Sequence, residues 1–264
     1  MSNDILSKIV ATKHGEVAES RKRISENELR QRAETGGLQQ RGFLKCLSEP
    51  GPSGVNIIAE IKRASPSKGD ICPDLNPAAY ASLYEKGGAV ALSVLTDNQY
   101  FKGGFNDFTA ARNAVSLPVI RKDFIVCPYQ LYESAVLGAD AVLLIVRILE
   151  PEQLKDYLDL AGELGLDVLT EAHSEKELEI AAQAGAKLTG INNRNLKSFE
   201  TDIQRSADMS ALFHSNQIPV AESGIHSRED ILKLMDAGIF NFLIGESIVR
   251  SPDPQAFIQS LMGK

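Results

Sequence analysis

The sequence has no tryptophan, only three cysteines and no long hydrophobic segment. Because Cys46, Cys72 and Cys127 form no CxxC pair, neither a disulfide framework nor a thiolate zinc site is predicted. The longest strongly apolar run, 141–146, is far shorter than the roughly 20 residues of a membrane-spanning helix. The first residues carry mixed charges and do not resemble a signal peptide. We therefore expect a protein of the reducing cytoplasm that does not enter membranes.

An excess of basic residues is also absent. The chain has 28 Lys and Arg against 35 Asp and Glu, a net charge of −7. Nucleic acids and anionic membranes require a contiguous positive field, so neither is an expected partner. No GxGxxG motif follows a predicted strand and no GxxxxGK[ST] motif occurs, so no dinucleotide or Walker-type site is predicted. Any anion that the protein handles must therefore be bound locally.

A repeated pattern begins after Gly54: an apolar run, a loop, a helical stretch and often a glycine. Glycine just past a helix supplies the positive backbone φ that such positions often require. Runs such as 141–146 are apolar on both faces, which is typical of parallel strands covered by helices. The pattern predicts eight βα units. Their apolar runs begin near Asn56, Ala89, Leu117, Ala141, Asp167, Leu188, Pro219 and Phe240.

Eight such units fit either an open doubly wound sheet or a closed (β/α)8 barrel. An open sheet gathers its site between two or three neighbouring strands, whereas a barrel brings all strand ends to one mouth. Charged or amide residues occur in five of the runs, which favours the barrel. We therefore predict a single α/β domain, residues 1–264, with the (β/α)8 TIM barrel fold. The polar strand residues are Glu60, Lys62, Lys122, Glu171, Asn192 and Glu222.

Residues 1–48 precede the first strand and are expected to form an N-terminal helical extension. Ile5, Ile9 and Val10 share one helix face, and a charged series follows them. Residues 4–35 are predicted to form one or two amphipathic helices outside the barrel, with a solvated polar face. The Ser-, Gly- and Pro-rich segment 48–54 separates this extension from the first strand.

Two lysines are candidates for acid–base chemistry. Glu60 and Lys62 are two residues apart, so both point to one face of the first strand, which in a barrel is the interior. They could form either a structural ion pair or part of a site. Lys122 faces opposite to Arg121 and Asp123, and if it points inward it joins Lys62 and can act as a general acid. The alternative is three solvated charges at the end of a strand.

Glu171 is an isolated carboxylate near the end of the fifth run. Buried beside lysines, it could serve as a general base. His173 lies on the same strand face and is expected to line the rim of the site. No metal is expected, because the chain has four histidines and no second one at a suitable spacing.

Three loops suit a phosphate group. Gly224 and Gly245 each follow a predicted strand and precede a helix, so their backbone N–H groups can approach an anion. In barrels, the loops after strands seven and eight are the recurrent phosphate position. The third loop, Ser65–Gly69, is polar and follows the first strand. Together these features predict a metal-free, cofactor-free enzyme that acts on a small phosphate ester by acid–base chemistry.

The same segments closely resemble the indole-3-glycerol phosphate synthase family through nearly the whole chain. The two most specific segments are 58–69 and 117–124. The segments that carry the resemblance are Ile5–Val10, Ile58–Gly69, Leu92–Asp97, Leu117–Phe124, Gly190–Asn195, Ala221–Ile225 and Ile244–Ser247.

The resemblance implies a carboxy-lyase that converts 1-(2-carboxyphenylamino)-1-deoxyribulose 5-phosphate into indole-3-glycerol phosphate, CO2 and water, in tryptophan biosynthesis. Lys122 is then the general acid at the substrate ketone, and Glu171 is the general base in the dehydration. Lys62 binds the substrate carboxylate, and whether it also donates a proton stays open. Glu60 and Asn192 orient these groups and the ribulose hydroxyls.

The family pattern also places substrate-binding and phosphate-binding residues. It implies a phosphorylated small-molecule substrate and no cofactor or metal, and a cytoplasmic monomer with at most weak contact to other tryptophan-pathway enzymes. It further implies that the N-terminal helix near residues 5–10 caps the barrel mouth. The substrate-binding residues would be Ser65, Phe124, Arg194, Leu196, Glu222 and Ser223, and the phosphate-binding residues Gly224, Gly245 and Glu246.

The sequence departs from the family pattern around two positions. Thr170 and Ala172 replace valines beside the glutamate and are expected to point outward, and Cys127 replaces an acidic residue at a predicted helix start, which weakens the cap. Two rival functions remain: a Schiff-base aldolase with Lys122 or Lys62 as nucleophile, and a phosphate-binding barrel without catalysis. Schiff-base barrels usually carry their lysine on strand six, where this chain has Asn192.

Overall fold

Within residues 5–36, 40–195 and 198–264, which the computed structural model describes, eight parallel strands close into a barrel. Each strand pairs with the next barrel strand along the chain, and the last pairs with the first through Asn56 and Asn241. The predicted (β/α)8 barrel is therefore confirmed. The barrel strands are β1 (Asn56–Ile61), β4 (Ala91–Leu95), β5 (Val119–Lys122), β6 (Ala141–Ile145), β7 (Asp167–Ala172), β8 (Leu188–Asn192), β9 (Ile218–Glu222) and β10 (Asn241–Ile244).

Alternate residues of each strand separate two buried layers. Along β6, Leu143 and Ile145 lie in the barrel interior with Ile58, whereas Val142 and Leu144 pack outward against the helices. Side chains alternate between the two faces of a strand, and helices cover the outer face, so both sets are buried. This explains why the strands are apolar throughout their length.

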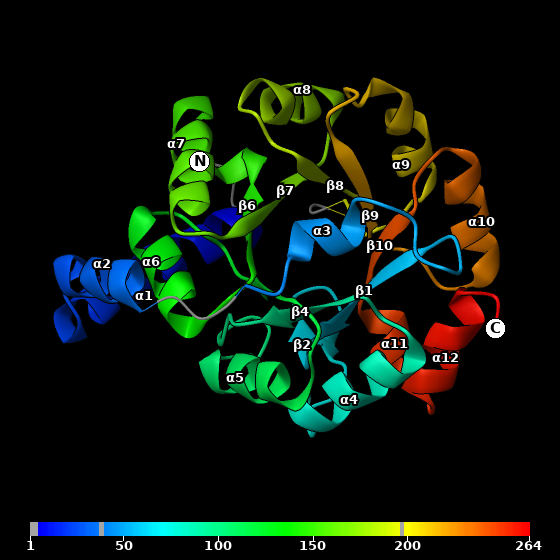
Figure 1. The fold of residues 1–264 in the computed structure, drawn as a ribbon, viewed down its shortest axis with the longest axis horizontal. Helices are drawn as coiled ribbons and strands as arrows, with labels where there is room; N and C mark the ends of the chain where they lie inside the picture. The colour runs from blue at the N-terminus through cyan, green and yellow to red at the C-terminus, as the bar shows by residue number, and fades with distance from the viewer. Residues whose placement is uncertain (1–4, 37–39, 196–197) are drawn as a thin grey trace.

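Helices surround the barrel (Figure 1). After β1, a short hairpin of β2 (Ala64–Ser65) and β3 (Gly69–Asp70) precedes the first of them. No helix among the described residues is long and apolar enough to cross a membrane. The helices are α4 (Pro77–Gly87), α5 (Phe105–Ala114), α6 (Pro128–Leu137), α7 (Pro151–Glu163), α8 (Glu175–Gln183), α9 (Gln204–Met209), α10 (Arg228–Asp236), α11 (Glu246–Arg250) and α12 (Pro254–Leu261), with 3-10 turns η1 (Val146–Ile148) and η2 (Ser210–Leu212).

Some strand boundaries differ by one or two residues from the predicted positions. β4, for example, begins at Ala91 and not at Ala89. The N–H group of Ala89 donates to the carbonyl of Tyr84 at 3.0 Å, after Gly88 has turned the chain with a φ of 100°. Ala89 therefore belongs to the end of α4, where glycine permits the left-handed turn.

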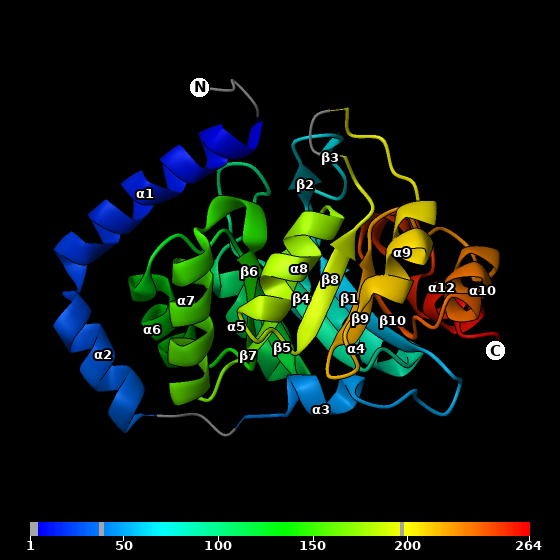
Figure 2. The ribbon, with the colours of Figure 1, turned by 90° about the horizontal axis from the view of Figure 1, so that it is seen from above.

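The N-terminal extension reaches both ends of the barrel (Figure 2). The predicted amphipathic helices are α1 (Ile5–Arg23) and α2 (Glu26–Thr35), separated at Ser25, which caps α2. A third helix, α3 (Phe43–Leu47), lies at the amino end of the strands, and Phe43 and Leu47 are buried with the barrel interior. Helix α3 could not be predicted from the sequence, because five residues are too few to show a helical period.

Candidate active site

A cavity lies at the carboxyl ends of the barrel strands, below α1. Parallel strands end at one mouth, so residues far apart in the sequence meet there. Except for His173, every predicted catalytic, substrate-binding or phosphate-binding residue among the described residues lines this cavity; Leu196 lies outside the described residues. These lining residues are Glu60, Lys62, Ser65, Lys122, Phe124, Glu171, Asn192, Arg194, Glu222, Ser223, Gly224, Gly245 and Glu246.

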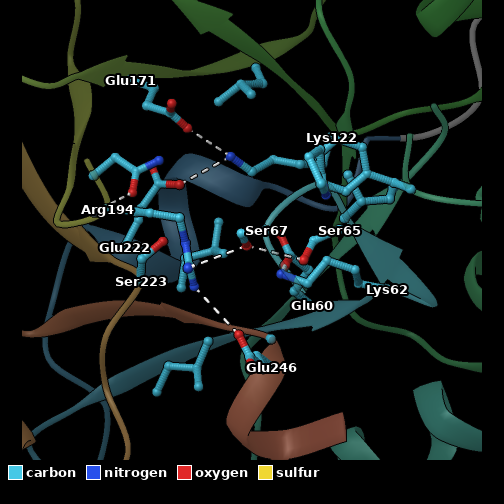
Figure 3. A pocket seen from close by; sticks show the side chains of 18 of the residues that line it. Glu60, Lys62, Ser65, Ser67, Lys122, Glu171, Arg194, Glu222, Ser223 and Glu246 are labelled. Carbon is cyan, nitrogen blue, oxygen red and sulfur yellow. Dashed lines mark hydrogen bonds and ion pairs between the residues drawn. The ribbon is translucent and has the colours of Figure 1, made fainter. Parts of the chain in front are cut away.

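Lys122 is the centre of the charged part of the cavity (Figure 3). Its Nζ atom lies 2.9 Å from Glu171 Oε2 and 3.1 Å from Glu222 Oε2. Burial alone would lower the pKa of Lys122, but the attraction of Glu171 and Glu222, followed by that of Glu60, raises this pKa above its usual value. Lys122 is therefore a fully protonated amine at the end of β5, held between two carboxylates.

The two carboxylates beside Lys122 differ in acidity. Burial would raise the pKa of Glu171, but Lys122 and a hydrogen bond from His173 bring it below the usual carboxyl value. For Glu222, burial dominates over Lys122, and the negative charge of Glu171 adds to it, so its pKa rises to about 7. Glu222 Oε1 is buried without a hydrogen-bond partner among the described residues. Glu171 is thus an ionised base, whereas Glu222 can carry a proton near neutral pH.

A second ion pair follows from the spacing of Glu60 and Lys62. Lys62 Nζ lies 2.5 Å from Glu60 Oε1, and both residues line the cavity. A Cβ atom at position 245 would collide with the Glu60 side chain, so this position requires glycine. The ion pair between Glu60 and Lys62, one of the two alternatives predicted from the sequence, therefore exists. Because it lies in the cavity wall, it can also contact a bound molecule.

One side of the cavity mouth presents backbone in the left-handed region. Ser223 and Gly224 have φ values of 69° and 78°. The nearby Glu246 carboxylate is bound by Arg194 at 3.4 Å and by Arg250 at 3.1 Å, and Lys68 lies 3.9 Å away. Three cations therefore offset the negative charge of Glu246 and leave this side suitable for an anion.

The opposite side of the cavity is apolar. Phe124 lies 6.0 Å from Phe101, measured between ring centroids, and both rings line the cavity. Ile5, Leu6 and Ile9 of α1 line it as well. This supports the expected capping by the first turns of α1. The sequence analysis had not identified Phe101, which lies in the loop after β4.

Helix α1 is attached to the barrel by a buried cation. Lys13 Nζ lies 3.0 Å from Asp97 Oδ2 and 2.9 Å from Asp123 Oδ1, and the Lys13 side chain is only 4% exposed. Asp123 also binds Arg121 at 2.9 Å. The alternative of three solvated charges at positions 121–123 is therefore wrong. The sequence contained only one signal for this arrangement: successive side chains of a strand point to opposite faces, as noted for Lys122.

His173 does not line the cavity, contrary to expectation. Its side chain is 1% exposed, and its Nε2 atom lies 2.9 Å from Glu171 Oε1. The strand parity was correctly predicted, but the ring is buried against Glu171 and does not line the cavity. No group of three or more His, Cys, Asp or Glu residues in the described part of the chain is arranged to hold a metal ion.

The departures from the family pattern lie outside the cavity. Thr170 pairs with Leu144, which packs outward against the helices, so Thr170 also points outward. Cys127 is the N-cap of α6, and its side chain makes no capping hydrogen bond. Neither residue lines the cavity.

A protonated amine between carboxylates of unequal acidity is the arrangement used in general acid–base catalysis. The carboxyl ends of barrel strands are also where this fold places its catalytic groups. The fold and the position of the site are thus those of a (β/α)8-barrel enzyme.

The model of the family "Indole-3-glycerol phosphate synthase" matches residues 6–261, and the chain belongs to this family. The indole-3-glycerol phosphate synthase of Desulfosudis oleivorans is 54% identical over 260 residues, which cover 98% of each chain. That of Syntrophobacter fumaroxidans is 49% identical over 261 residues, covering 99% of this chain and 98% of the relative. Membership of the family makes the chain a decarboxylating lyase of tryptophan biosynthesis.

The solved structures support the fold alone. A tryptophan synthase complex from Pyrococcus furiosus contains a chain that superposes with a TM-score of 0.60 at 15% identity, covering 79% of this chain and 98% of that one. At such low identity, only the shared barrel architecture can be inferred.

Proposed function

We propose that the chain converts 1-(2-carboxyphenylamino)-1-deoxyribulose 5-phosphate into indole-3-glycerol phosphate, CO2 and water by lysine and glutamate acid–base catalysis. The observation that carries this proposal is the position of Lys122 between Glu171 and Glu222 in a cavity with an apolar side and an anion-binding side. A substrate with an aromatic ring at one end and a phosphate at the other matches these two sides.

Lys122 is the general acid in ring closure. The ring carbon that bears the carboxylate attacks the ketone carbon, and Lys122 donates a proton to the ketone oxygen as the new C–C bond forms. The developing negative charge on that oxygen makes the protonated amine bind the transition state more tightly than the substrate. Loss of CO2 then returns its bonding electrons to the ring, which becomes aromatic again.

Glu171 is the general base in the dehydration. It removes a proton from the methylene carbon next to the nitrogen. The hydroxyl on the adjacent carbon takes a proton from a lysine of the cavity and leaves as water, and the indole double bond forms. A base must be ionised to accept this proton, and the pKa of Glu171, which lies below the usual value because Lys122 and His173 outweigh burial, meets that requirement.

Lys62, Glu60 and Asn192 hold the substrate for these steps. Lys62 binds the substrate carboxylate, and Glu60 fixes the Lys62 amine at 2.5 Å. The Oδ1 atom of Asn192 accepts the N–H of Arg194 at 3.0 Å, so its amide nitrogen is directed by this contact and can bind a ribulose hydroxyl. Such fixed partners reduce the reorganisation needed to reach the transition state.

The remaining residues bind the two ends of the substrate. Gly224, Gly245 and Glu246 offer backbone N–H groups to the phosphate, and Ser223 and Arg194 flank them. Phe124 forms the wall for the aromatic ring, and Ser65 lies in the hairpin above Lys62. Leu196 keeps its proposed role in substrate binding on the basis of the family pattern.

The site disfavours Schiff-base chemistry. A lysine nucleophile needs an unprotonated amine, and Glu171 and Glu222 outweigh burial to raise the pKa of Lys122. We therefore expect that borohydride added with substrate traps no covalent adduct on Lys122 or Lys62.

The absence of tryptophan permits a direct test. Substrate is added to metal-stripped protein in EDTA, and indole emission, to which the chain itself contributes nothing, is followed with time. A rising signal, with the product identified by mass, supports the proposal. Tight binding of the substrate without turnover would instead support the non-catalytic phosphate-binding barrel, and absence of binding would contradict the proposed substrate.

A further inference from the structure

His173 is a buried histidine in direct contact with the proposed base. Its side chain is 1% exposed, and its Nε2 atom lies 2.9 Å from Glu171 Oε1. Because an ionised carboxylate can only accept hydrogen bonds, Nε2 must carry the hydrogen. The other carboxylate oxygen, Oε2, faces Lys122 at 2.9 Å. The two oxygens of Glu171 therefore have separate partners, one buried outside the cavity lining and one within the cavity.

The other ring nitrogen of His173 indicates which tautomer the contacts favour. Nδ1 is buried and has no hydrogen-bond partner among the described residues. A protonated imidazolium would place an unpaired N–H group there, which is costly in a buried environment. The neutral tautomer with its hydrogen on Nε2 leaves only a lone pair at Nδ1, so the contact geometry assigns this tautomer.

The backbone of His173 is held independently of any substrate. Its N–H group donates to Glu177 Oε2 at 2.8 Å, and Ser174, the N-cap of α8, accepts the N–H of Glu177 at 3.3 Å. The other oxygen of Glu177 is bound by Arg147 Nη2 at 2.8 Å. The backbone of His173 is thus attached to the start of α8, outside the cavity.

We propose that His173 is a positioning residue for the general base: its Nε2–H group holds Oε1 of Glu171 so that Oε2 stays directed at the substrate. This inference rests on the proposed function, in which Glu171 removes a proton during dehydration. The charged groups that face Glu171 are Lys122 from β5 and Glu222 from β9, and Glu60 from β1 acts on both of these; His173 donates from outside the cavity lining.

Three substitutions separate the donor from the bulk of the ring. His173→Phe keeps an aromatic ring but removes the donor. His173→Gln places an amide N–H near the position of Nε2, whereas His173→Asn reaches only the position of Nδ1 and serves as the matched control. For Phe and Asn, we expect kcat to fall about tenfold or more, the range for loss of a charge-assisted hydrogen bond, with KM within about twofold. His173→Gln should recover most of kcat.

Two further measurements report on the proposed general base, Glu171, and not on the stability of the fold. Loss of the donor raises the pKa of Glu171, so the acidic limb of the kcat–pH profile should move to higher pH in the Phe and Asn variants. Substrate deuterated at the methylene carbon should show a larger isotope effect in these variants, because dehydration becomes slower than the other steps.

The outcomes distinguish this inference from the proposed function. Wild type without turnover would contradict the proposed function itself. Wild-type turnover together with unchanged kcat and an unchanged acidic limb in His173→Phe would overturn the role of His173, and so would a loss of kcat that Gln does not recover. If the Phe variant fails to fold, the comparison of Gln with Asn decides. In wild type labelled with 15N-histidine, a protonated Nδ1 of His173 would also overturn the assignment.

Discussion

The two ends of the barrel both contain carboxylates with little exposure, but these have different partners. At the amino end, the buried Asp140 accepts the backbone N–H groups of Arg41 and Val119, each at 2.8 Å, with Arg112 3.7 Å away, and the half-buried Asp167 accepts the N–H group of Leu44 at 2.8 Å. At the carboxyl end, Glu171 and Glu222 instead share the Lys122 amine. Backbone amides cannot give up their protons, whereas a lysine between two carboxylates can take part in proton transfer. The carboxylate contacts at the amino end therefore stabilise the fold, and we propose that the chemistry takes place at the carboxyl end.

The largest expected effect comes from a substitution that disrupts packing only at the amino end of the barrel. Phe43 is fully buried in the barrel interior. Truncation in Phe43→Ala should lower the free energy of unfolding by roughly 3–5 kcal/mol through lost burial and an unfilled cavity. Urea unfolding measures this loss, while kcat of the folded protein should stay within twofold of wild type. A large loss of kcat at unchanged stability would show that the two ends are not separate.

The converse substitution removes a charged side chain at the carboxyl end of the barrel. Lys122→Ala should lower kcat by roughly 10²-fold or more, as expected for loss of a general acid. Stability should change little, because Glu222, whose pKa burial already raises to about 7, can take up a proton when the cation is removed. The indole assay and thermal unfolding measure the two quantities, with Lys155→Ala on the exposed face of α7 as control. A near-normal rate would contradict the role of Lys122.

An intermediate effect concerns the attachment of α1 to the carboxyl end. Lys13→Met removes the cation bound to Asp97 and Asp123 and should weaken the closure of α1 over the apolar side. If about 1.4 kcal/mol of this docking energy supports substrate binding, KM rises about tenfold, and kcat changes less. Lys22→Met, which breaks only an exposed pair with Glu19, is the control. Unchanged KM in Lys13→Met would show that α1 closes without this ion pair.

The smallest expected effect is a pH dependence of stability. The pKa of Glu222 rises from 4.5 in the unfolded chain to about 7 in the folded protein, because burial outweighs the attraction of Lys122. Folding therefore favours the protonated form: its stabilising contribution is complete below pH 4.5 and is lost as the pH rises through about 7. Glu171 and Asp123 have lowered pKa values, so their contributions vary only below this window.

Urea unfolding between pH 5 and pH 7 measures this dependence. Glu222→Gln should remove the part of the decline that is due to Glu222, and the difference from wild type cancels the titration of the histidines. Equal slopes in the two proteins would show that Glu222 has an ordinary pKa.

Part of the site could be predicted from strand parity. Because side chains alternate along a strand, the sequence placed Glu60 and Lys62 on one face of the first strand, and Lys122 on the face opposite to Arg121 and Asp123. The structure shows that Lys122 is the residue that points into the cavity. The different acidities of Glu171 and Glu222 could not be predicted, because they depend on which carboxylate receives a second donor. That donor, His173, is two residues from Glu171, but its burial follows from the packing of α8.

By itself, the sequence predicted the eight βα units and the closed barrel, and it indicated the polar strand residues at the barrel mouth. These predictions follow from apolar runs, glycines at helix ends and the spread of polar residues over five runs, whereas the remaining site residues follow from the family resemblance. Only the tertiary structure decided that Lys13 of α1 binds Asp97 and Asp123, that α3 closes the amino end, and that His173 contacts Glu171. The physical reason is that these contacts join segments whose spacing along the chain carries no periodic signal, so only packing brings them together.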